Sequence, residues 1–436
     1  MHPFRLLSAI VLLSSCLLPE GKPLFPGATE SVWVKSGEGI EWVASADGGA
    51  PVLRVKVPER RKSAWDVQVE ARAPGEVPKG WVEISLSVRA LKTDSEGGLC
   101  TVGLKLLTRP QNDGIGRWEA RAGKNWTSFR FLCPLERDFP ADTLALAVMF
   151  AGAAQDLEVS GLSVIWLSET ESAQRREEAR KKLDEEVRLR PRIAGLPAVS
   201  NGQHWELRFQ DEFSGDKLDE TKWKVREGAR HDAMRTARAV TVENGALRMG
   251  IFREGDKVYN SWVDTEGLFS QTYGYFCARM KMHGSTGHWN AFWLQAKTVG
   301  NVDGSGRDGT EIDIMEKPWL TDEVNHALHW DGYGKDHQSS GIRSTTPGVM
   351  TGYHNFSLLW TPTEYVFFVD EAEVWRTHAG GVCQVPVHLR ITDEAQASEK
   401  SWAGDVRKAK LPDAWYVDWV RVYSLVDGKG KEVMKP

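Results

Sequence analysis

Hydrophobic and polar residues alternate in short runs over most of the chain, which is the period of β-strands. Such runs occupy residues 52–57, 81–88, 157–164, 275–282 and 415–423. Gly, Pro and Asp separate the runs, as expected of turns. The pattern predicts an all-β protein with a β-sandwich over residues 24–167 and a second, larger sandwich over residues 200–428.

Residues 168–199 depart from this alternation. They are dense in Glu, Lys and Arg up to Arg190, with few apolar side chains. Ser168 at the start and Pro191 at the end are typical of helix boundaries. Acidic and basic residues nearly cancel, which disfavours a nucleic-acid-binding arm. The segment is therefore predicted to be a solvated, charged helical linker between the two sandwiches.

The N-terminus is predicted to carry an export signal. The apolar stretch from Leu6 to Leu18 suits a signal peptide and is short for a membrane span. Leu13-Ser14-Ser15-Cys16 also resembles a bacterial lipobox, in which the cysteine is lipidated. Residues 1–23 are predicted to be either a signal peptide or a lipoprotein signal. Both alternatives predict an exported protein that is extracellular, periplasmic or held at the bacterial envelope through a lipid on Cys16.

Composition narrows the class of partner. The 436 residues include 55 basic and 60 acidic side chains, which gives a formal net charge of −5 and no strong attraction to nucleic acid. Nineteen Trp against eight Tyr is an unusual ratio. Indole faces suit sugar rings as well as protein cores, so sugar binding and a Trp-rich core both explain the count.

Four cysteines follow the signal, two in each half of the chain. In an exported protein the pairs Cys100–Cys133 and Cys277–Cys383 are one interpretation, and buried free thiols are the other. The spacing does not decide between them. No Cys-x-x-Cys pair is present, which argues against a zinc site built on thiolates.

The segment Gly309–Glu316 places three carboxylates within six residues of an apolar, β-branched strand, where burying them is costly. On a regular strand Glu311 and Asp313 share one face, and Glu316 points to the other. A β-bulge at Ile314-Met315 inserts one residue and returns Glu316 to the face of Glu311. The two glutamate carboxyls are then expected about 5 to 5.5 Å apart, as in retaining glycosidases.

This spacing assigns a role to each acid. Glu311 is the predicted nucleophile, Glu316 the general acid and then base, and Asp313 their electrostatic partner. Repulsion from Asp313, or a hydrogen bond with it, would keep one neighbour protonated near neutral pH. No catalytic cofactor is needed. An acidic strand edge facing solvent and a calcium ligand set are the alternatives.

Blocks around the segment make the chain resemble glycoside hydrolase family 16, whose signature is Glu-x-Asp-x-x-Glu on a bulged strand. The blocks include Asp211-Glu212-Phe213-Ser214-Gly215, Val242-Glu243-Asn244-Gly245-Ala246-Leu247, Gly287-His288-Trp289-Asn290-Ala291-Phe292-Trp293-Leu294, His329-Trp330 and Val417-Asp418-Trp419-Val420-Arg421-Val422-Tyr423. The resemblance covers residues 203–425. It implies a concanavalin-like β-jelly-roll with an open cleft, and endo-acting hydrolysis or transfer on β-linked polysaccharides with retained configuration.

The resemblance also implies binding residues. The substrate-binding candidates are Trp289, Asn290, Trp293, His329, Trp330 and Glu394. The candidates for a structural Ca²⁺ site are Glu212, the Gly245 carbonyl and Asp418. A hydrogen-bonded join of the termini is the alternative at that second set.

Two further resemblances concern the substrate. Residues 388–394, which end in Glu394, are similar to the Glu-containing version of galactan-degrading members, which weakens a simple β-1,3-glucanase assignment. The first sandwich loosely resembles carbohydrate-binding modules at scattered positions that include Trp65, Arg89 and Trp126. A purely structural sandwich explains the same residues.

The leading hypothesis is an exported retaining endo-β-glycanase acting on a β-1,3-glucan or a galactan of the agar or carrageenan type. A transglycosylase shares the first half of this mechanism and differs only in the acceptor. An inactive carbohydrate-binding surface protein is the alternative from another class. The polysaccharide is the expected partner, and nothing in the sequence indicates an oligomeric state.

Overall fold

The structure is a computed structural model that describes residues 21–24, 33–44, 51–93, 97–107, 113–190, 192 and 195–435. Cys16 and almost all of the predicted export signal lie outside these residues. The chain divides into two compact units, unit 1 (Val187–Pro436) and unit 2 (His2–Glu186). Among the described residues, no helix combines the length and the apolar character that a membrane span requires.

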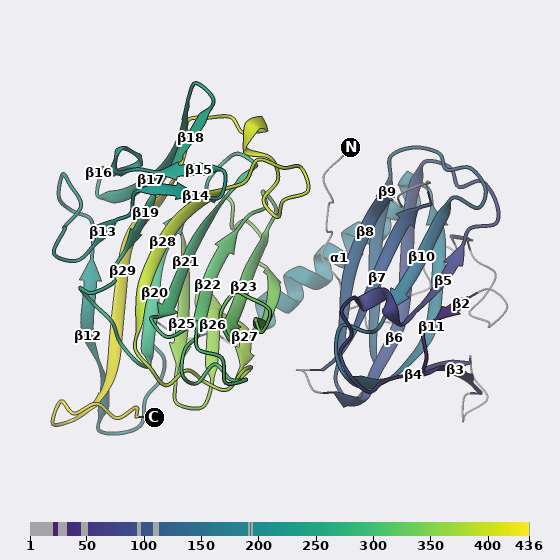
Figure 1. Ribbon diagram of the computed structural model, residues 1–436, viewed down its shortest axis with the longest axis horizontal. Helices are drawn as coiled ribbons and strands as arrows, with labels where there is room; N and C mark the ends of the chain where they lie inside the picture. The colour runs from purple at the N-terminus through teal and green to yellow at the C-terminus, as the bar shows by residue number, and fades with distance from the viewer. Residues whose placement is uncertain are drawn as a thin grey trace. The chain divides into compact units, whose positions relative to one another are not determined.

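Unit 2 is a sandwich of two antiparallel sheets (Figure 1). The first has the order β3-β4-β11-β6-β9 with β1 on β11, and consists of β1 (Lys22–Pro23), β3 (Ile40–Val43), β4 (Val52–Val57), β6 (Gly80–Thr93), β9 (Thr127–Leu135) and β11 (Gln155–Leu167). The second has the order β2-β5-β10-β7-β8, and consists of β2 (Val34–Ser36), β5 (Gln68–Arg72), β7 (Gly98–Leu106), β8 (Asp113–Ala122) and β10 (Leu144–Met149). A short 3₁₀ helix, η1 (Ala64–Asp66), precedes β5. Alternate residues such as Leu157 and Val159 are buried in the core of this unit.

The helix α1 (Glu169–Leu189) forms where the charged segment predicted it. The backbone N–H of Glu171 donates to the Ser168 hydroxyl at 3.2 Å, and the backbone N–H of Ser168 donates to the Glu171 carboxylate at 2.8 Å, which together form a capping box. One side of the helix is nevertheless buried, because Arg175 forms an ion pair at 2.7 Å with Glu83 of β6. The prediction of a fully solvated helix was wrong here, since a buried ion pair leaves no apolar stripe in the sequence.

Unit 1 contains two larger sheets. The first has the order β14-β15-β18-β17-β29-β20-β25-β26-β27, with β12 on β29 and β16 on β17. Its strands are β12 (Gln203–Asp211), β14 (Gly228–Arg230), β15 (Ala233–Arg235), β16 (Val240–Glu243), β17 (Ala246–Glu254), β18 (Lys257–Asn260), β20 (Gly274–Lys281), β25 (His354–Trp360), β26 (Tyr365–Val369), β27 (Ala372–Thr377) and β29 (Asp413–Asp427). Short 3₁₀ helices are η2 (Ala237–Ala239) and η3 (Val406–Lys408).

The second sheet of unit 1, which we call the site sheet, has the order β13-β19-β28-β21-β22-β23-β24. Its strands are β13 (Lys224–Val225), β19 (Trp262–Asp264), β28 (Val387–Ala395), β21 (His288–Ala296), β22 (Glu311–Lys317), β23 (Glu323–Trp330) and β24 (Gln338–Thr345). All of its pairs are antiparallel. The protein is therefore all-β with a jelly-roll-like sandwich in unit 1, as predicted.

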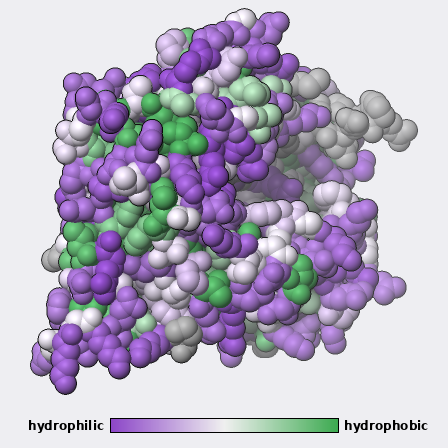
Figure 2. Space-filling model, turned by 60° about the vertical axis from the view of Figure 1, so that its left-hand side comes forward, coloured by the Kyte–Doolittle hydropathy of each residue, from purple (hydrophilic) through white to green (hydrophobic). Residues whose placement is uncertain are grey.

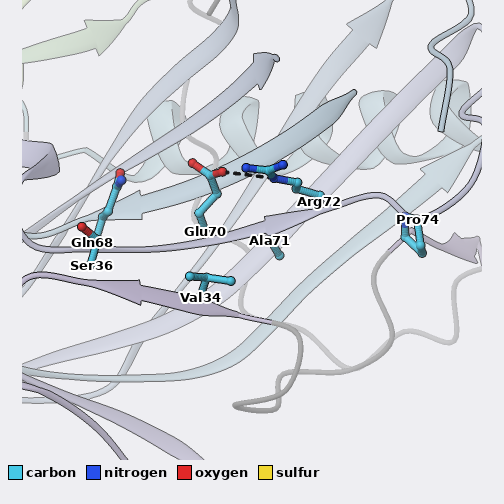
Figure 3. A pocket seen from close by; sticks show the side chains of 7 residues that line it. All are labelled: Val34, Ser36, Gln68, Glu70, Ala71, Arg72 and Pro74. Atoms are coloured by element: carbon cyan, nitrogen blue, oxygen red, sulfur yellow. Dashed lines mark ion pairs between the residues drawn. The ribbon is translucent and has the colours of Figure 1, made fainter. Parts of the chain in front are cut away.

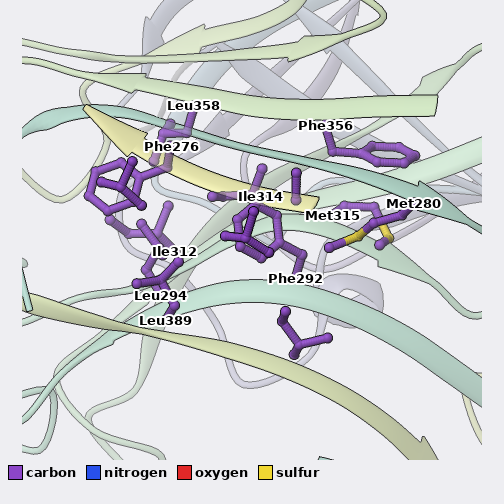
Figure 4. Close-up of a cluster of buried hydrophobic side chains, with 14 of the residues drawn as sticks. Phe276, Met280, Phe292, Leu294, Ile312, Ile314, Met315, Phe356, Leu358 and Leu389 are labelled. Atoms are coloured by element: carbon purple, nitrogen blue, oxygen red, sulfur yellow. The ribbon is translucent and has the colours of Figure 1, made fainter. Parts of the chain in front are cut away.

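A hydrophobic core joins the two sheets of unit 1. Figure 4 shows Phe292, Leu294, Ile312, Ile314, Met315 and Leu389 of the site sheet together with Phe276, Met280, Phe356 and Leu358 of the other sheet. The face of the molecule seen in Figure 2 is mostly hydrophilic, with hydrophobic groups in separate small patches. One face of the site sheet is thus packed against the other sheet of unit 1.

The four cysteines of the described chain are free and buried. Cys100 and Cys133 belong to the core of unit 2, and Cys277 and Cys383 lie in unit 1. Of the two interpretations left open by the sequence, the structure has the buried free thiols.

Candidate active site

Strand β22 carries the three carboxylates, and its pairing with β21 shifts by one residue. Trp293 of β21 pairs with Asp313, whereas the preceding Phe292 pairs with Met315. One step along β21 therefore corresponds to two residues along β22, and Ile314 is the additional residue that forms the bulge. The pairing with β23 shifts within the same stretch. The bulge predicted at Ile314-Met315 is confirmed.

The bulge brings Glu311, Asp313 and Glu316 to one face of the site sheet. Their partners on β21 are the alternate residues Gln295, Trp293 and Ala291. Their partners on β23 are the alternate residues His329, Ala327 and Asn325. Alternate residues of a strand share a face, so the three carboxylates do as well. We call this face the site face.

Burial and charge act together on the two glutamates. Burial, followed by the negative charge of Asp313, raises the pKa of Glu316 well above its ordinary value. The same two causes raise the pKa of Glu311 to about 7. Both glutamates therefore hold their protons more tightly than a free glutamate does, which suits the role of a general acid.

Neutral donors hold both carboxyl groups in place. Asn325 Nδ2 donates to Glu316 Oε2 at 2.9 Å, and Gln295 Nε2 donates to Glu311 Oε2 at 2.9 Å. The Tyr333 hydroxyl donates to the same oxygen of Glu311. Each of these hydrogen bonds favours the ionised carboxylate and opposes the effect of burial.

Asp313 has a histidine as its partner. His329 Nε2 lies 3.3 Å from Asp313 Oδ2, and His329 Nδ1 lies 2.9 Å from His337 Nε2. Burial lowers the pKa of His329, but the hydrogen bond and charge of Asp313 outweigh it and raise this pKa. Polar atoms of Glu311, Asp313 and His329 lie within 4.8 Å of one another, a group that could also hold a metal ion.

Tyr333 reaches Glu311 from the loop between β23 and β24. Asp331 anchors this loop, because its Oδ1 accepts the backbone N–H groups of Asp303 and Gly304, both at 3.1 Å. Its Oδ2 accepts Gln338 Nε2 at 2.7 Å. The loop thereby holds Tyr333 near Glu311. Its sequence has no strand periodicity, so the position of Tyr333 in the site could not be predicted from the pattern of residues.

The sequence also missed Gln295 and Asn325. Both stand at alternating positions of strands next to β22. Strand alternation around the bulge would have placed them beside the carboxylates, had the register of the neighbouring strands been known.

Trp289 and Trp293 lie on the site face, as predicted, but both are more than nine-tenths buried. The Arg390 guanidinium lies 4.7 Å from the centre of the Trp293 ring. The rings of His231 and Trp402 lie 5.8 and 5.7 Å from that of Trp289. Their flat faces are thus largely covered by other side chains.

Two predicted binding residues point away from the site face. Asn290 lies between Trp289 and Ala291, is fully buried, and its Oδ1 accepts the backbone N–H of His283 at 3.2 Å. Trp330 follows His329 and belongs to the hydrophobic core. The assignment of Asn290 and Trp330 to substrate binding was wrong, because successive residues of a strand face opposite sides.

Glu394 pairs with Trp289 across β28 and β21, and so reaches the site face. Its Oε2 lies 2.9 Å from both Arg230 Nε and His231 Nε2. Burial would raise the pKa of Glu394, but these two neighbours outweigh it and lower this pKa. Glu394 is therefore an anionic residue held by two basic ones.

The residues proposed for calcium do not fit that ion. Glu212 forms two hydrogen bonds with the Arg421 guanidinium at 2.8 and 2.9 Å. Asp418 forms an ion pair with Arg279. Each carboxylate is neutralised by its own arginine, which leaves neither as a free anionic ligand for Ca²⁺.

Two cavities of about 450 and 470 Å³ lie in unit 2. The first is lined by Val34, Ser36, Gln68, Glu70, Ala71, Arg72 and Pro74 (Figure 3). The Glu70 and Arg72 side chains at its wall form an ion pair at 3.6 Å. Neither of these two cavities is lined by a residue of the site sheet.

Residues 227–421 match the family model described as Glycosyl hydrolases family 16. This unit belongs to glycoside hydrolase family 16. Among its relatives, the keratan-sulfate endo-1,4-beta-galactosidase of Sphingobacterium multivorum is 29% identical over 51% of this chain and 56% of its own length. The beta-glucanase of Rhodothermus marinus is 27% identical over 54% of this chain and 91% of its own length. The chain thus spans little more than half of the first of these relatives.

The family 16 unit is also similar to a solved structure, the laminarinase from Rhodothermus marinus. That structure is 26% identical, with a TM-score of 0.43, over 52% of this chain and 99% of the solved chain. The family match includes the whole of β22 and both neighbouring strands.

Proposed function

We propose that the protein is an exported, retaining endo-β-glycanase that cleaves internal β-glycosidic bonds of a polysaccharide by double displacement. The observation that carries the proposal is the bulge at Ile314-Met315, which gathers Glu311, Asp313 and Glu316 on one face. Membership of a family of glycosyl hydrolases supports it. The apolar stretch from Leu6 to Leu18 supports export.

In the first step, the Glu311 carboxylate attacks the anomeric carbon while Glu316 donates its proton to the leaving glycosidic oxygen. The carbon–oxygen bond breaks, and a glycosyl ester of Glu311 forms. Gln295 and Tyr333 orient the attacking carboxylate through their hydrogen bonds to Glu311 Oε2.

In the second step, ionised Glu316 takes a proton from water, whose oxygen attacks the anomeric carbon and releases Glu311. The configuration at that carbon is inverted twice and is therefore retained. Asp313, with His329 as its partner, supports the return of the proton to Glu316 because its negative charge raises the pKa of that group.

We place the substrate among β-1,3-glucans and galactans. The two relatives described above are named as a galactosidase on keratan sulfate and as a glucanase. Residues 388–394, with Glu394 on the site face, favour the galactan side of this range.

The test is incubation of the full chain with laminarin, lichenan, xyloglucan, agarose, porphyran and carrageenan. Release of oligosaccharides from one or more of them, with the β-anomer appearing first by NMR, is expected of wild type and lost in Glu316→Gln. Glu243→Gln changes an exposed glutamate of β16 and serves as the control. An α-anomer as first product, or full activity of Glu316→Gln, would contradict the proposal.

The length of the products distinguishes hydrolysis from transfer. A hydrolase converts the polysaccharide only to shorter chains, whereas a transglycosylase also yields chains longer than the starting material. We expect shorter chains alone.

A further inference from the structure

Four arginines gather at one end of the site sheet. Arg226, Arg230, Arg235 and Arg390 form this arginine cluster. Three of the guanidinium groups surround the Trp262 indole, with Arg230 and Arg390 each 5.5 Å and Arg235 5.1 Å from its ring centre. Trp262 is 3% exposed, so the arginines rather than the indole form the surface there.

Three carboxylates neutralise part of the cluster. Arg226 pairs with Asp264 at 2.5 Å and with Glu266 at 2.7 Å. Arg230 pairs with Glu394 at 2.9 Å. Four guanidinium groups therefore face three carboxylates, and one positive charge remains in excess.

The excess falls on Arg235 and Arg390. Within the described part of the chain, neither has a carboxylate at ion-pair distance. Arg235 donates to the backbone carbonyls of Gly228 and Glu227 at 3.3 and 3.2 Å. Arg390 Nε donates to His388 Nε2 at 2.9 Å. Burial, followed by the like charge of Arg230, lowers the pKa of Arg235, although Glu394 and Asp264 act in the opposite direction.

The cluster lies on the same face as the catalytic carboxylates. Arg390 pairs with Trp293, and Trp293 pairs with Asp313, so these three residues form one row across the site sheet. Arg390 is two strands from β22, and Asp264 of β19 continues the row one strand further. Three strand spacings amount to roughly 14 Å, a distance that a bound sugar chain spans with a few units.

We propose that the arginine cluster is a subsite for a negatively charged substituent of the polysaccharide, a sulfate ester or a uronate carboxylate. This inference rests on the proposed glycanase function and narrows its substrate to anionic β-glycans. Guanidinium groups bind oxyanions through paired N–H donors, and Arg235 and Arg390 are both partly exposed. An anion bound beside them would offset the positive charge that the three carboxylates leave in excess.

The test measures binding by the full chain carrying Glu311→Gln, which prevents turnover. The probes are two matched pairs: porphyran with its desulfated form, and a glucuronate-bearing β-glycan before and after carboxyl reduction. Affinity electrophoresis gives the ratio of affinities within each pair. The same ratios are measured after adding Arg235→Gln, Arg390→Gln or the charge-preserving Arg235→Lys. Arg238→Gln is the matched control, because Arg238 pairs with Glu254 outside the cluster at 2.7 Å.

The charged member of one pair is expected to bind at least about tenfold more tightly than its uncharged form. A tenfold ratio is the size of effect expected of one charge-assisted hydrogen bond. The pair that shows this preference identifies sulfate or carboxylate. Arg235→Gln and Arg390→Gln should remove most of the preference, Arg235→Lys should keep part of it, and Arg238→Gln should keep all of it. Higher salt should weaken it.

Equal binding within both pairs, or a preference that survives both glutamine variants, would overturn the subsite. Wild-type cleavage of the polysaccharide panel separates this result from failure of the proposed function. Cleavage without charge preference would refute the subsite alone. Absence of cleavage together with a charge preference that depends on Arg235 would refute the glycanase and leave an anion-binding site.

Discussion

Glu311 and Glu316 differ in how strongly their surroundings resist ionisation. Both are raised in pKa by burial and by Asp313, but Glu311 has two neutral donors on one oxygen and Glu316 has one. The two donors on Glu311 favour its ionised form, as its assigned role of nucleophile requires, and the raised pKa of Glu316 suits its assigned role of general acid.

The pH dependence of kcat/KM follows from these pKa values. Activity needs ionised Glu311 and protonated Glu316, so the acidic limb should lie near pH 7, and the raised pKa of Glu316 should move the alkaline limb upward from the range of a free glutamate. Asn325→Ala removes a donor that favours ionised Glu316, raises the pKa of this glutamate, and should move the alkaline limb upward. The control is Asn125→Ala in unit 2. An alkaline limb that stays in place or moves to lower pH would contradict the assignment.

The same raised pKa has a cost in stability. Because the folded state holds the Glu316 proton more tightly than the unfolded state does, stability falls as pH rises from about 4.3, the unfolded value, through the folded value. Glu316→Gln should therefore stabilise the protein at pH 8, by on the order of 1 kcal/mol, and have little effect at pH 4. Thermal unfolding at both pH values measures this, with Glu243→Gln as control. Equal effects at the two pH values would contradict it.

Residue types and spacing were enough to find the three acids, but not most of their partners. Asp313 and the two glutamates stand in one short segment, whereas Asn325, Gln295 and Tyr333 come from other strands and a loop. The errors at Asn290 and Trp330 have the same origin. Each stands next to a site-face residue in sequence, and the strand alternation turns it to the core.

At the scale of the element, the bulge in β22 decides whether the site exists. Ile312, Ile314 and Met315 are fully buried in the core, and the acids between and beyond them stand on the other face (Figure 4). Two consecutive core residues are possible only because one of them is the inserted residue. The bulge was predictable from the sequence, because without it the segment could not bury its apolar residues and also place all three acids on the other face.

Deleting Met315 tests the bulge directly. The deletion removes the additional residue and restores regular alternation, which leaves Glu316 on the site face with Glu311 and Asp313. We therefore expect the deletion variant to keep hydrolytic activity, with lower stability because a core side chain is lost. Met315→Leu keeps the strand length and about the same volume, and should retain activity with a stability loss below about 1.5 kcal/mol. Hydrolysis rates and circular dichroism are the measurements. A deletion variant that folds but has no activity would contradict the view that the bulge serves only to place Glu316 on the site face.

At the scale of the whole chain, each unit has a core of its own, the one around Phe292 in unit 1 and the one around Phe131 in unit 2. Alternation along the sequence predicted two sandwiches. It could not predict which strands pair, since β12 pairs with β29, more than two hundred residues away along the chain. Such pairings depend on contacts between distant segments that local patterns do not contain.

The separate cores predict two calorimetric transitions. Phe292→Ala should lower the midpoint temperature of the unit 1 transition alone, and Phe131→Ala that of the unit 2 transition alone. Each substitution should reduce the free energy of unfolding of its unit by roughly 3 to 5 kcal/mol. Each variant is the control for the other. A single transition shifted by both substitutions would show that the chain unfolds as one cooperative body.

The central claim is that Glu311 forms a covalent bond to the sugar. Its most direct test is the reaction of Glu311→Ala with an activated β-glycoside and azide, followed by NMR of the product. Azide replaces the missing carboxylate from the same side, so the predicted product is the glycosyl azide of inverted, α configuration. A β-configured azide, or no azide adduct from a correctly folded variant, would contradict Glu311 as the nucleophile.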